Sequence, residues 1–591
     1  MSDDNVKHRV YPIAAVAPKD TDGTKGKNDQ TTGKNEGGKE NKLTTANALI
    51  ELAVGSCEFF HDERGDGYAL VTDNKIRRTL RLRSKAFRGW LAGTFYKTTQ
   101  RAANNEALST ALSVLEAKAI NDNGQVELSN RFAMVDSAIY IDLADKQWRA
   151  VKVTAAGWEI LDKPSVLFRR YSHQQVLPDP VSGGKLFDIH CHLGIKSNDD
   201  KHLLEAYLVA CAFSNVPRPA ITFHGPQGAS KTTTARCLKA ITDPSLLGSV
   251  DLGKSPADLA QILDHHGVPC FDNLTSIPAW AADMLCRGIS GGAFSKRELY
   301  SDDSDIILSF KRAIIITGIN IPTHAPDLLD RLLLIELERI TPVKRVDEVT
   351  FWALFDKEKP KLFGALLDAI TGTLQHLPKI KLTRMARMAD FTRIARAYAE
   401  YIGIGKKKML AIIMKHTSRQ TEEVLAADSV ATAILGFIKE KGSWTGTATE
   451  LLKLLNEAAP TPRPHDWPRQ PNSLTKRMNT IHTTLNEASI RIVKDKGRNN
   501  GRIMKLEYKA ISSSPSSSPS ACPTHKDSAV DDEGKLSPVG SSGEDDACSV
   551  KLSSSVLSSP SKTSTGKASD DKDGKDDESD VLSNRHVVSV R

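Results

Sequence analysis

The chain has 591 residues, of which 40% are hydrophobic and 26% are charged, and its formal net charge is +8 at neutral pH. This length is too great for one hydrophobic core, and the composition is typical of a water-soluble protein with several folded units. No apolar run reaches the roughly 18 residues of a membrane-spanning helix, and residues 1–10 lack the apolar segment of a signal peptide. We therefore expect a cytoplasmic protein with no membrane partner.

Both ends of the chain are predicted to be disordered. Residues 1–43 contain few apolar side chains, and residues 509–591 are rich in serine and carry an acidic tract near their end. Neither segment can bury enough apolar surface to offset the conformational entropy that folding removes. The tail is interpreted as a solvated extension, and the alternative is a regulatory tail that competes with DNA.

Residues 44–170 are predicted to form an α+β domain. Apolar residues recur with helical spacing in 84–100 and 106–118, whereas 138–143 and 148–153 alternate like the two strands of a hairpin. No pair of nearby acidic residues on strands would hold two metal ions for polymerisation, so priming is not predicted. A basic string could line nucleic acid or form a solvated face; it comprises Lys75, Arg77, Arg78, Arg81, Arg83, Lys85 and Arg88.

Residues 171–345 are predicted to contain a nucleotide-binding core. A strand at 219–224 leads into a glycine-rich loop and then into a helix that begins at Lys231. Such a loop turns its backbone N–H groups toward a phosphate at a helix N-terminus, where the peptide dipole favours negative charge. Ser230 stands where the usual motif has a second glycine, and Gly228 can supply backbone freedom instead. The predicted ATP-binding residues are Gly225, Pro226, Gln227, Gly228, Ala229, Ser230, Lys231, Thr232 and Thr233.

Hydrolysis of ATP needs a cation, a metal ion and a positioned water molecule. Lys231 would reach the β- and γ-phosphates, and Thr232 would place its hydroxyl on Mg²⁺. Asp272 follows an apolar strand at 267–271 and is predicted to hold the same metal from the opposite side. The next residue is Asn273, which can orient a water molecule but cannot take its proton. Either another acid serves as the catalytic base, or hydrolysis is slow.

Two further residues complete the predicted catalytic set. Asn320 follows a strand at 313–317, and its amide could hydrogen-bond the γ-phosphate or the attacking water. Arg331 precedes the next strand and is placed to stabilise charge during phosphoryl transfer, at the site of the neighbouring subunit. The alternative for Arg331 is an ion pair within its own chain, with Asp327 or Asp330.

An insertion at 280–309 lies between the second and third strands of this core. A helix gives way to a glycine pair and then to a loop or hairpin with exposed basic residues. Lys296 and Arg297 are candidates to hold a single-stranded DNA backbone, and Phe294 or Tyr300 could stack on bases. The alternative for Arg297 is a contact with nucleotide at a subunit interface.

With these residues the chain resembles the superfamily 3 helicases and the helicase parts of phage and plasmid replication proteins, a branch of the AAA+ ATPases. It also looks like a group of bacterial phage- or plasmid-type ATP-binding proteins. The resemblance covers about 200–340 and rests on four segments in order: GPQGASKTT, CFDN, SGGAFSKRELYSDD and IIITGIN. It implies an AAA+ P-loop ATPase that assembles as a homo-oligomer, a hexameric ring, and translocates on DNA. Many relatives carry a second acid where this chain has Asn273.

Two more domains are predicted downstream. Residues 346–425 are helical by their apolar spacing and would form a lid on the ATPase core. Residues 426–508 have the order of a winged helix: helices at 429–439, 448–457 and 473–488, a polar step at 443–447, and a strand pair at 491–494 and 504–508. The alternative use of such a domain is protein contact. Its candidates for DNA phosphate contact are Lys476, Arg477, Lys494, Lys496, Arg498 and Arg502.

The function predicted from these features is an ATP-dependent DNA motor. We expect a helicase that replicates a phage, a plasmid or an integrated mobile element, with single-stranded or forked DNA as its partner and ATP and Mg²⁺ as cofactors. The alternative is an AAA+ switch or defence-type ATPase that assembles on nucleic acid without unwinding it. Asn273 favours the alternative, because it leaves the catalytic base unassigned.

Overall fold

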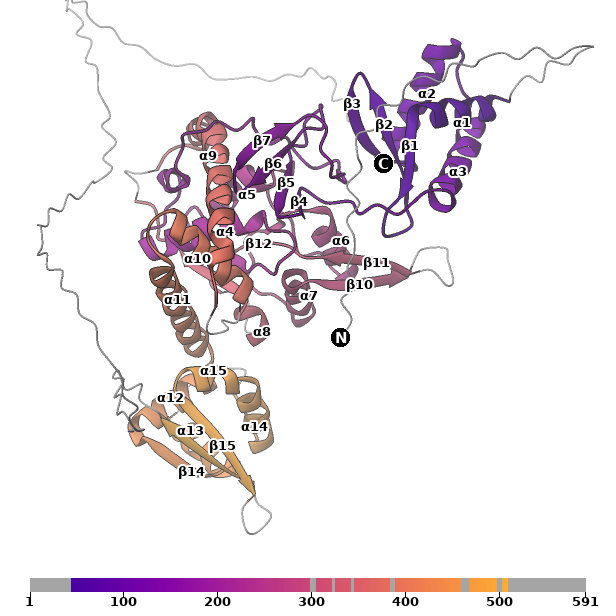
Figure 1. Cartoon of the computed structure of the whole chain (residues 1–591). Coiled ribbons are helices and arrows are strands. Elements are labelled where there is room, and N and C mark those ends of the chain that lie inside the picture. The colour runs from indigo at the N-terminus through magenta and orange to yellow at the C-terminus, as the bar shows by residue number, and fades with distance from the viewer. Residues whose placement is uncertain are drawn as a thin grey trace, which may run out of the picture. The chain divides into compact units, whose positions relative to one another are not determined.

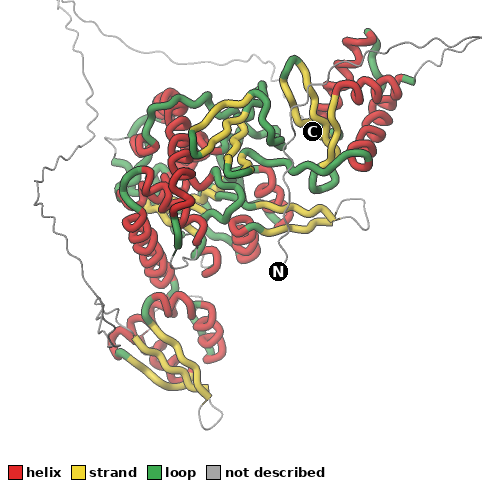
Figure 2. The backbone as a smooth tube through the Cα atoms, in the orientation of Figure 1, coloured by secondary structure: helices red, strands yellow, loops and turns green. Residues whose placement is uncertain are grey.

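Helices and several small sheets alternate along the chain, as the mixed α/β prediction requires (Figure 1; Figure 2). The computed structural model describes residues 44–297, 305–321, 325–341, 345–382, 388–458, 467–496 and 502–508. These residues all belong to one compact unit, Met1–Ser513. The segments predicted to be disordered, 1–43 and 509–591, lie outside the described residues. Among the described helices, none is long and apolar enough to cross a membrane.

The first folded part is a three-stranded antiparallel sheet covered by helices. Its sheet has the order β1-β2-β3 and was not predicted, whereas the two helices expected at 84–100 and 106–118 are present. Buried leucine, phenylalanine and alanine side chains of the helices and sheet form a core of their own. The elements are α1 (Thr45–Ser56), β1 (Cys57–His61), β2 (Gly67–Asp73), β3 (Ile76–Arg81), α2 (Lys85–Thr99) and α3 (Asn105–Asn121).

Part of the basic string on β3 and α2 is already paired with acids. Arg78 lies 3.0 Å from Asp73, and Arg83 forms an ion pair with Glu116. Paired guanidinium groups have less free charge for a phosphate backbone, which favours the solvated-face interpretation of this string over the nucleic-acid one.

A four-stranded antiparallel meander follows, and it contains the hairpin predicted from the alternating pattern. Its strands are β4 (Phe132–Val135), β5 (Ala138–Asp142), β6 (Ala150–Thr154) and β7 (Gly157–Leu161). Ile139, Val151 and Val153 share one continuous core with the elements that come after residue 185. The hydrophobic cores therefore divide near residue 130, inside the segment expected to be one N-terminal domain, and the domain limits themselves stay predictions.

The central element is a parallel sheet with the order β13-β8-β12-β9. Successive side chains alternate between two cores: Ile315 and Leu333 point into one, and Ile314 and Leu334 into the other. Both faces are thus covered by helices, as a parallel sheet requires. The elements are η1 (Leu186–Cys191), α4 (Asn198–Cys211), β8 (Ala220–His224), α5 (Lys231–Thr242), α6 (Pro256–His265), β9 (Cys270–Phe271), α7 (Ala279–Ser290), β12 (Ile314–Thr317), α8 (Pro326–Leu329) and β13 (Leu332–Glu336).

The insertion before the third strand is a hairpin and not a loop. β10 (Gly292–Arg297) pairs antiparallel with β11 (Asp305–Phe310), and Figure 1 shows the two strands extending away from the parallel sheet. The hairpin begins directly after α7 and ends just before β12. Its base therefore lies at the amino-terminal edge of the parallel sheet.

Helices follow the sheet, as predicted for 346–425. They are α9 (Glu348–His376), the short 3-10 helix η3 (Leu377–Lys379), α10 (Ala389–Tyr401) and α11 (Lys406–Ala427). Gly372 lets α9 and α10 approach closely, since a Cβ there would lie 1.9 Å from the ring of Tyr401. α11 covers the outer edge of β13, where His416 and Arg419 bind the backbone of Leu334.

The last folded part has its own core, and two details differ from the sequence prediction. The polar step SWTGT is strand β14 (Ser443–Thr447), which pairs with β16 because Trp444 and its threonine neighbours suit an extended ladder. The single helix expected at 473–488 is two helices, which divide at the buried Ile481. The other elements are α12 (Ser429–Lys441), α13 (Ala448–Ala458), α14 (Pro471–Thr480), α15 (His482–Glu487), β15 (Ile490–Lys496) and β16 (Arg502–Tyr508).

Candidate active site

The loop between β8 and α5 has the backbone that a phosphate-binding loop needs. Gly225 and Gly228 have φ values of 137° and 77°, which favour glycine. Ser230 also has a positive φ, 54°, so the residue that replaces the usual glycine adopts a left-handed conformation. Gly225 is constrained further, because a Cβ there would lie 2.1 Å from the carbonyl oxygen of Leu337.

Backbone hydrogen bonds hold this loop from both sides. The Gly225 N–H donates to the carbonyl of Ile319 at 3.1 Å, just beyond β12. On the other side, the Ile340 N–H donates to the carbonyl of Gly228 at 3.1 Å, just beyond β13. The loop is therefore fixed between the carboxyl ends of two parallel strands, where ligands bind in open α/β sheets.

Lys231 begins α5 and folds back over the loop. Its Nζ donates hydrogen bonds to the carbonyls of Gly225 at 2.7 Å and Pro226 at 2.9 Å. Burial lowers the pKa of Lys231, and the nearby carboxylate of Asp272 opposes the shift. The ammonium thus lies where the first turn of the helix and the loop would meet a phosphate group.

Three oxygen-bearing side chains converge at the carboxyl ends of the strands. The Thr232 hydroxyl donates to both carboxylate oxygens of Asp272, at 2.9 and 3.1 Å. Thr317, the last residue of β12, donates its hydroxyl to the same carboxylate and accepts the Asn273 N–H at 2.8 Å. Sequence reasoning placed Thr232 and Asp272 together but missed Thr317, whose only signal was its position at the end of an apolar strand.

This oxygen set fits a magnesium ion. Hydroxyl and carboxylate oxygens are the ligands that Mg²⁺ prefers, and Thr232 and Asp272 already lie within hydrogen-bonding distance of each other. Mg²⁺ commonly keeps several water ligands and is completed by phosphate oxygens, so two protein ligands suffice. Among the described residues no cluster of three or more histidine, cysteine or acidic side chains offers a competing site.

The two amides predicted near the γ-phosphate lie at neighbouring strand ends. Asn273 has a φ of 54°, a conformation that asparagine tolerates better than most residues, and its side chain is exposed. Asn320 follows β12 by three residues and is also exposed. Because β12 and β9 are adjacent in the sheet, both amides can face one water molecule, although neither position is an acid.

Arg331 lies at the amino-terminal ends of the parallel strands, opposite the ends that carry the phosphate loop. It immediately precedes β13, whose first residue pairs with Ala220 at the start of β8, whereas the phosphate loop follows the end of β8. Its guanidinium donates to the backbone carbonyl of Asp327 and, at 3.2 Å, to the hydroxyl of Ser290. Arg331 therefore has no access to the phosphate loop of its own chain.

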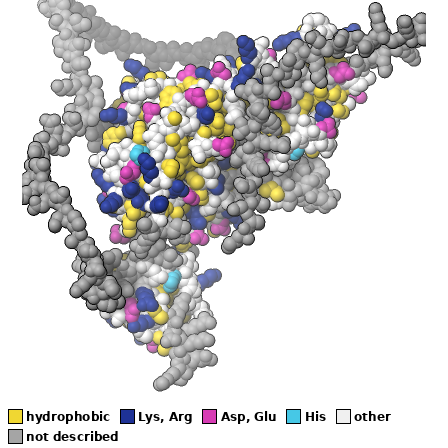
Figure 3. All heavy atoms as spheres, in the orientation of Figure 1, with side chains coloured by type: hydrophobic (Ala, Val, Ile, Leu, Met, Phe, Trp, Pro, Cys, Tyr) yellow, Lys and Arg dark blue, Asp and Glu magenta, His cyan; other side chains and the backbone are white. Residues whose placement is uncertain are grey.

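The DNA-binding candidates are described to different extents. Lys296 and Arg297 lie on β10, opposite Ile306 and Asp305, while Phe294 packs against the core beneath the hairpin. Tyr300 and Arg498 lie outside the described residues, and of Lys494, Lys496 and Arg502 only the backbone placement on β15 and β16 is described. On the face seen in Figure 3, lysine and arginine side chains are interspersed with acidic and hydrophobic ones.

On α14 the two candidates differ in their surroundings. Lys476 is exposed, whereas Arg477 lies 2.7 Å from the carboxylate of Asp428. Asp428 caps the start of α12 through the N–H groups of Val430 and Ala431. Arg477 therefore has a structural partner, and Lys476 is the better candidate for a phosphate contact.

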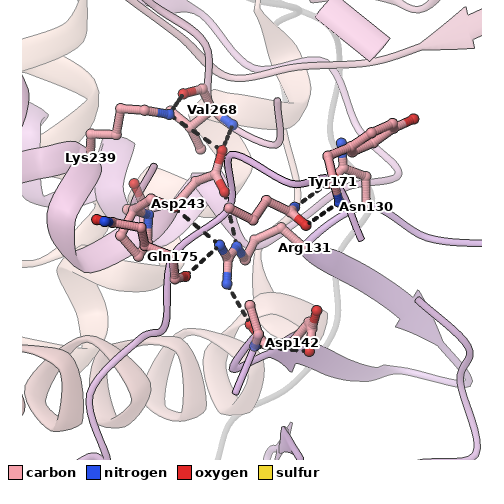
Figure 4. Close-up of polar contacts among 12 residues, drawn as sticks. Asn130, Arg131, Asp142, Tyr171, Gln175, Lys239, Asp243 and Val268 are labelled. Carbon is pink, nitrogen blue, oxygen red and sulfur yellow. Dashed lines mark hydrogen bonds and ion pairs between the residues drawn. The ribbon is translucent and has the colours of Figure 1, made fainter. Parts of the chain in front are cut away.

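The far end of α5 is anchored by a fully buried arginine. Figure 4 shows the guanidinium of Arg131 among backbone carbonyls and the carboxylate of Asp243, at 2.9 Å. Lys239 approaches the same carboxylate at 3.4 Å and donates to the carbonyl of Val268 at 2.9 Å. Burial alone would raise the pKa of Asp243, but Lys239 and Arg131 hold it well below its ordinary value. This network fixes the helix that carries Lys231 and Thr232 at its other end.

Two family models match the region that holds this site and the region after it. Residues 191–411 match the model described as the actinomycete integrative conjugative element replication protein, and residues 430–520 match the C-terminal domain of the same protein. The chain carries both domains of this replication-protein family. The phosphate loop, Asp272, Thr317 and Arg331 lie in the first of the two domains, whereas Lys476 and Arg477 lie in the second.

Comparisons with individual proteins add little to the family match. No curated protein matches the chain. An apo structure of the NrS-1 C-terminal region covers 79% of this chain and 100% of its own, with 11% identity and a TM-score of 0.36. A JCV helicase structure covers 37% of this chain and 59% of its own, with 15% identity and a TM-score of 0.21. Neither likeness is close enough to bear on the fold or chemistry of this chain.

Proposed function

We propose that this replication-protein family member is an ATP-dependent DNA motor, a helicase that acts in the replication of an integrative conjugative element. The observation that carries the proposal is the convergence of Lys231, Thr232 and Asp272 around a loop with the backbone of a phosphate cradle. The match to a family of replication proteins supplies the DNA context. An AAA+ core, a helical lid at 346–425 and a winged helix at 426–508 belong to the same proposal.

The residues of the loop would divide the work of phosphoryl transfer. Backbone N–H groups of the loop and the Lys231 ammonium would hold the β- and γ-phosphates. The ammonium would then give up its present hydrogen bonds to the carbonyls of Gly225 and Pro226. Thr232 and Asp272 would hold Mg²⁺, which when bound neutralises charge on the phosphate oxygens. Asn320 and Asn273 would orient the attacking water, and the acceptor of its proton is unassigned.

Assembly into a ring would complete the site. Arg331 is at the sheet edge opposite the phosphate loop, and the base of the β10–β11 hairpin is at that same edge. In a head-to-tail ring this edge can face the nucleotide of the neighbouring subunit, where a guanidinium would stabilise the transition state. Lys296 and Arg297 on the hairpin, and Lys476 on α14, would contact the phosphates of single-stranded or forked DNA.

The decisive experiment measures ATP hydrolysis by the full chain with and without single-stranded DNA. We expect DNA to raise the rate several-fold, and we expect Lys231→Ala to be inactive because it removes the cation that holds the phosphates. Unwinding of a forked duplex by the wild-type protein then tests the helicase step. If DNA does not change the rate of ATP hydrolysis and the forked duplex is not unwound, the motor proposal is wrong.

The second candidate is an ATP-driven switch that assembles on DNA without unwinding it. Asn273 favours this candidate, since no second acid follows Asp272. Asn273→Asp tests it, because aspartate also tolerates the left-handed backbone and supplies a carboxylate. A rise in hydrolysis of about ten-fold or more in this variant would indicate that the natural enzyme is a slow switch. An unchanged or lower rate would favour the motor.

A further inference from the structure

The segment that follows β13 runs along the phosphate loop. The Leu337 N–H donates to the carbonyl of His224 at 2.8 Å, and the Ile340 N–H donates to the carbonyl of Gly228 at 3.1 Å. Two backbone hydrogen bonds therefore hold residues 337–340 against the loop. The backbone of the residues between these two anchors is therefore kept next to the phosphate loop.

Arg339, which belongs to this segment, and Arg345, which comes later in the chain, both lie beside the loop. Measured from an ideal Cβ built on Gly228, a terminal guanidinium nitrogen of Arg345 is 3.4 Å away, and the Cγ and Nε atoms of Arg339 are 3.8 and 3.9 Å away. Both arginines are exposed, and neither has an ion pair or side-chain hydrogen bond to another described residue. The acid next to Arg339 is Glu338, and it pairs with Lys196 instead.

The negative charge of ATP gives a reason for arginine side chains at this position that are unpaired among the described residues. ATP carries about four negative charges, and a bound Mg²⁺ and Lys231 together supply three positive ones. Arg331 lies at the amino-terminal ends of the parallel strands and adds no positive charge to the ATP site of its own chain. A guanidinium can donate two parallel hydrogen bonds to one phosphate, which makes arginine the better side chain for this task.

We propose that Arg339 and Arg345 are additional phosphate-binding residues that recognise the γ-phosphate of the nucleotide held by their own chain. The inference rests on the proposed function, since it assigns these arginines to the same ATP site. Arg345 lies three residues before α9, whose first turn begins at Glu348. A contact with the γ-phosphate would thus connect the nucleotide state to the helices that follow the sheet.

The test compares two nucleotides that differ by one phosphate. Equilibrium binding of fluorescent ATPγS and fluorescent ADP, both with Mg²⁺, is measured for the full-length wild type, Arg339→Ala, Arg345→Ala and the double variant. We expect each single variant to bind ATPγS about ten-fold more weakly and ADP less than three-fold more weakly, because the lost charge-assisted bonds go to the γ-phosphate. The matched control is Arg393→Ala, an exposed arginine on α10.

The outcomes separate this inference from the proposed function. Lys231→Ala is expected to lose both nucleotides, and a wild-type protein that binds neither would overturn the ATP site and the inference together. If the wild type binds ATPγS but the double variant weakens ATPγS and ADP equally, or weakens neither, the γ-phosphate assignment is wrong while the ATP site stands. Arg345→Lys and Arg339→Lys should recover part of the ATPγS affinity, since lysine keeps the charge but loses the paired geometry.

Discussion

At the scale of single residues, Gly225 and Gly228 have different reasons for being glycine. Gly225 needs both its positive φ and the space next to the Leu337 carbonyl, whereas Gly228 needs only its φ, since no atom would lie closer than 3.4 Å to a Cβ there. The two positions therefore form a matched pair with different expected costs.

Gly225→Ala should be the more harmful of the two substitutions. We expect it to destabilise the fold by about 2 kcal/mol or more and to abolish nucleotide binding, because a hydrogen bond from the Leu337 N–H to the His224 carbonyl holds the Leu337 backbone against the loop. Gly228→Ala should cost about 1 kcal/mol and leave weakened binding. Thermal unfolding and ATPγS titration of both variants measure this, and equal losses would contradict the assigned close contact.

Thr317 is the residue of the site that no sequence motif revealed. Its hydroxyl donates to Asp272 and accepts the Asn273 N–H, so it fixes the carboxylate proposed to hold the metal. We expect Thr317→Val to lower kcat between about ten-fold and a hundred-fold while the KM for ATP changes little, because a misaligned carboxylate impairs positioning more than binding.

The control for this prediction keeps the hydroxyl and removes only the methyl group. Thr317→Ser should recover most of the rate, and raising the Mg²⁺ concentration should partly rescue Thr317→Val. If the serine variant is as slow as the valine variant, the role of Thr317 is packing and the positioning assignment fails.

At the scale of secondary-structure elements, α11 covers a strand edge that would otherwise be open. β13 is the edge strand of the parallel sheet, and the Nε2 of His416 lies 3.0 Å from the N–H of Leu334 and 3.1 Å from its carbonyl oxygen. Arg419 adds a bond to the same carbonyl at 3.1 Å. The backbone N–H and carbonyl of Leu334 are therefore already occupied and cannot pair with a strand of another chain.

This contact predicts a pH dependence of stability. Burial lowers the pKa of His416 from its ordinary value of 6.5 to about 4. Between these two values the unfolded chain takes up a proton at this residue and the folded chain does not. Stability is therefore full above about pH 6.5, and it should fall by roughly 1 kcal/mol per pH unit as the pH decreases toward 4.

Urea unfolding of wild type and His416→Gln at pH 7 and pH 5 checks this prediction. The wild type should lose more stability between the two pH values than the variant does, since other histidines contribute equally to both proteins. His376→Gln, at the half-exposed end of α9, serves as the control and should behave like the wild type. A variant that keeps the full pH dependence would exclude His416 as the titrating group.

At the scale of the whole molecule, the position of Arg331 predicts cooperation between subunits. Arg331→Ala and Lys231→Ala should each be inactive, but a mixture of the two should regain part of the ATPase activity. In a mixed ring the intact Arg331 of the Lys231→Ala subunit can serve the intact phosphate loop of its neighbour. Hydrolysis rates across mixing ratios measure this, and a mixture without activity would show that Arg331 does not act in the neighbouring site.

Local signals in the sequence determined most elements of the fold. The helices at α2, α3, α5 and α7, the hairpin of β5 and β6, and the strands that carry the site all follow from apolar periodicity and from glycine and proline punctuation. The phosphate loop was recognisable because its chemistry requires consecutive residues. The sheet β1-β2-β3 and strand β14 were missed, since their polar or irregular patterns are strands only through pairing with distant partners.

The tertiary structure alone decided which residues meet at the site and which do not. Thr317, Arg339 and Arg345 carry no motif, and they reach the phosphate loop because parallel strands bring distant carboxyl ends to one edge. The same strand order takes Arg331 to the opposite ends of the strands. Arg131 is held by a buried ion pair to Asp243 at the end of α5, although the two residues are 112 positions apart in the chain. A sequence records which side chains follow one another, whereas these contacts depend on strand order and register, which long-range packing sets.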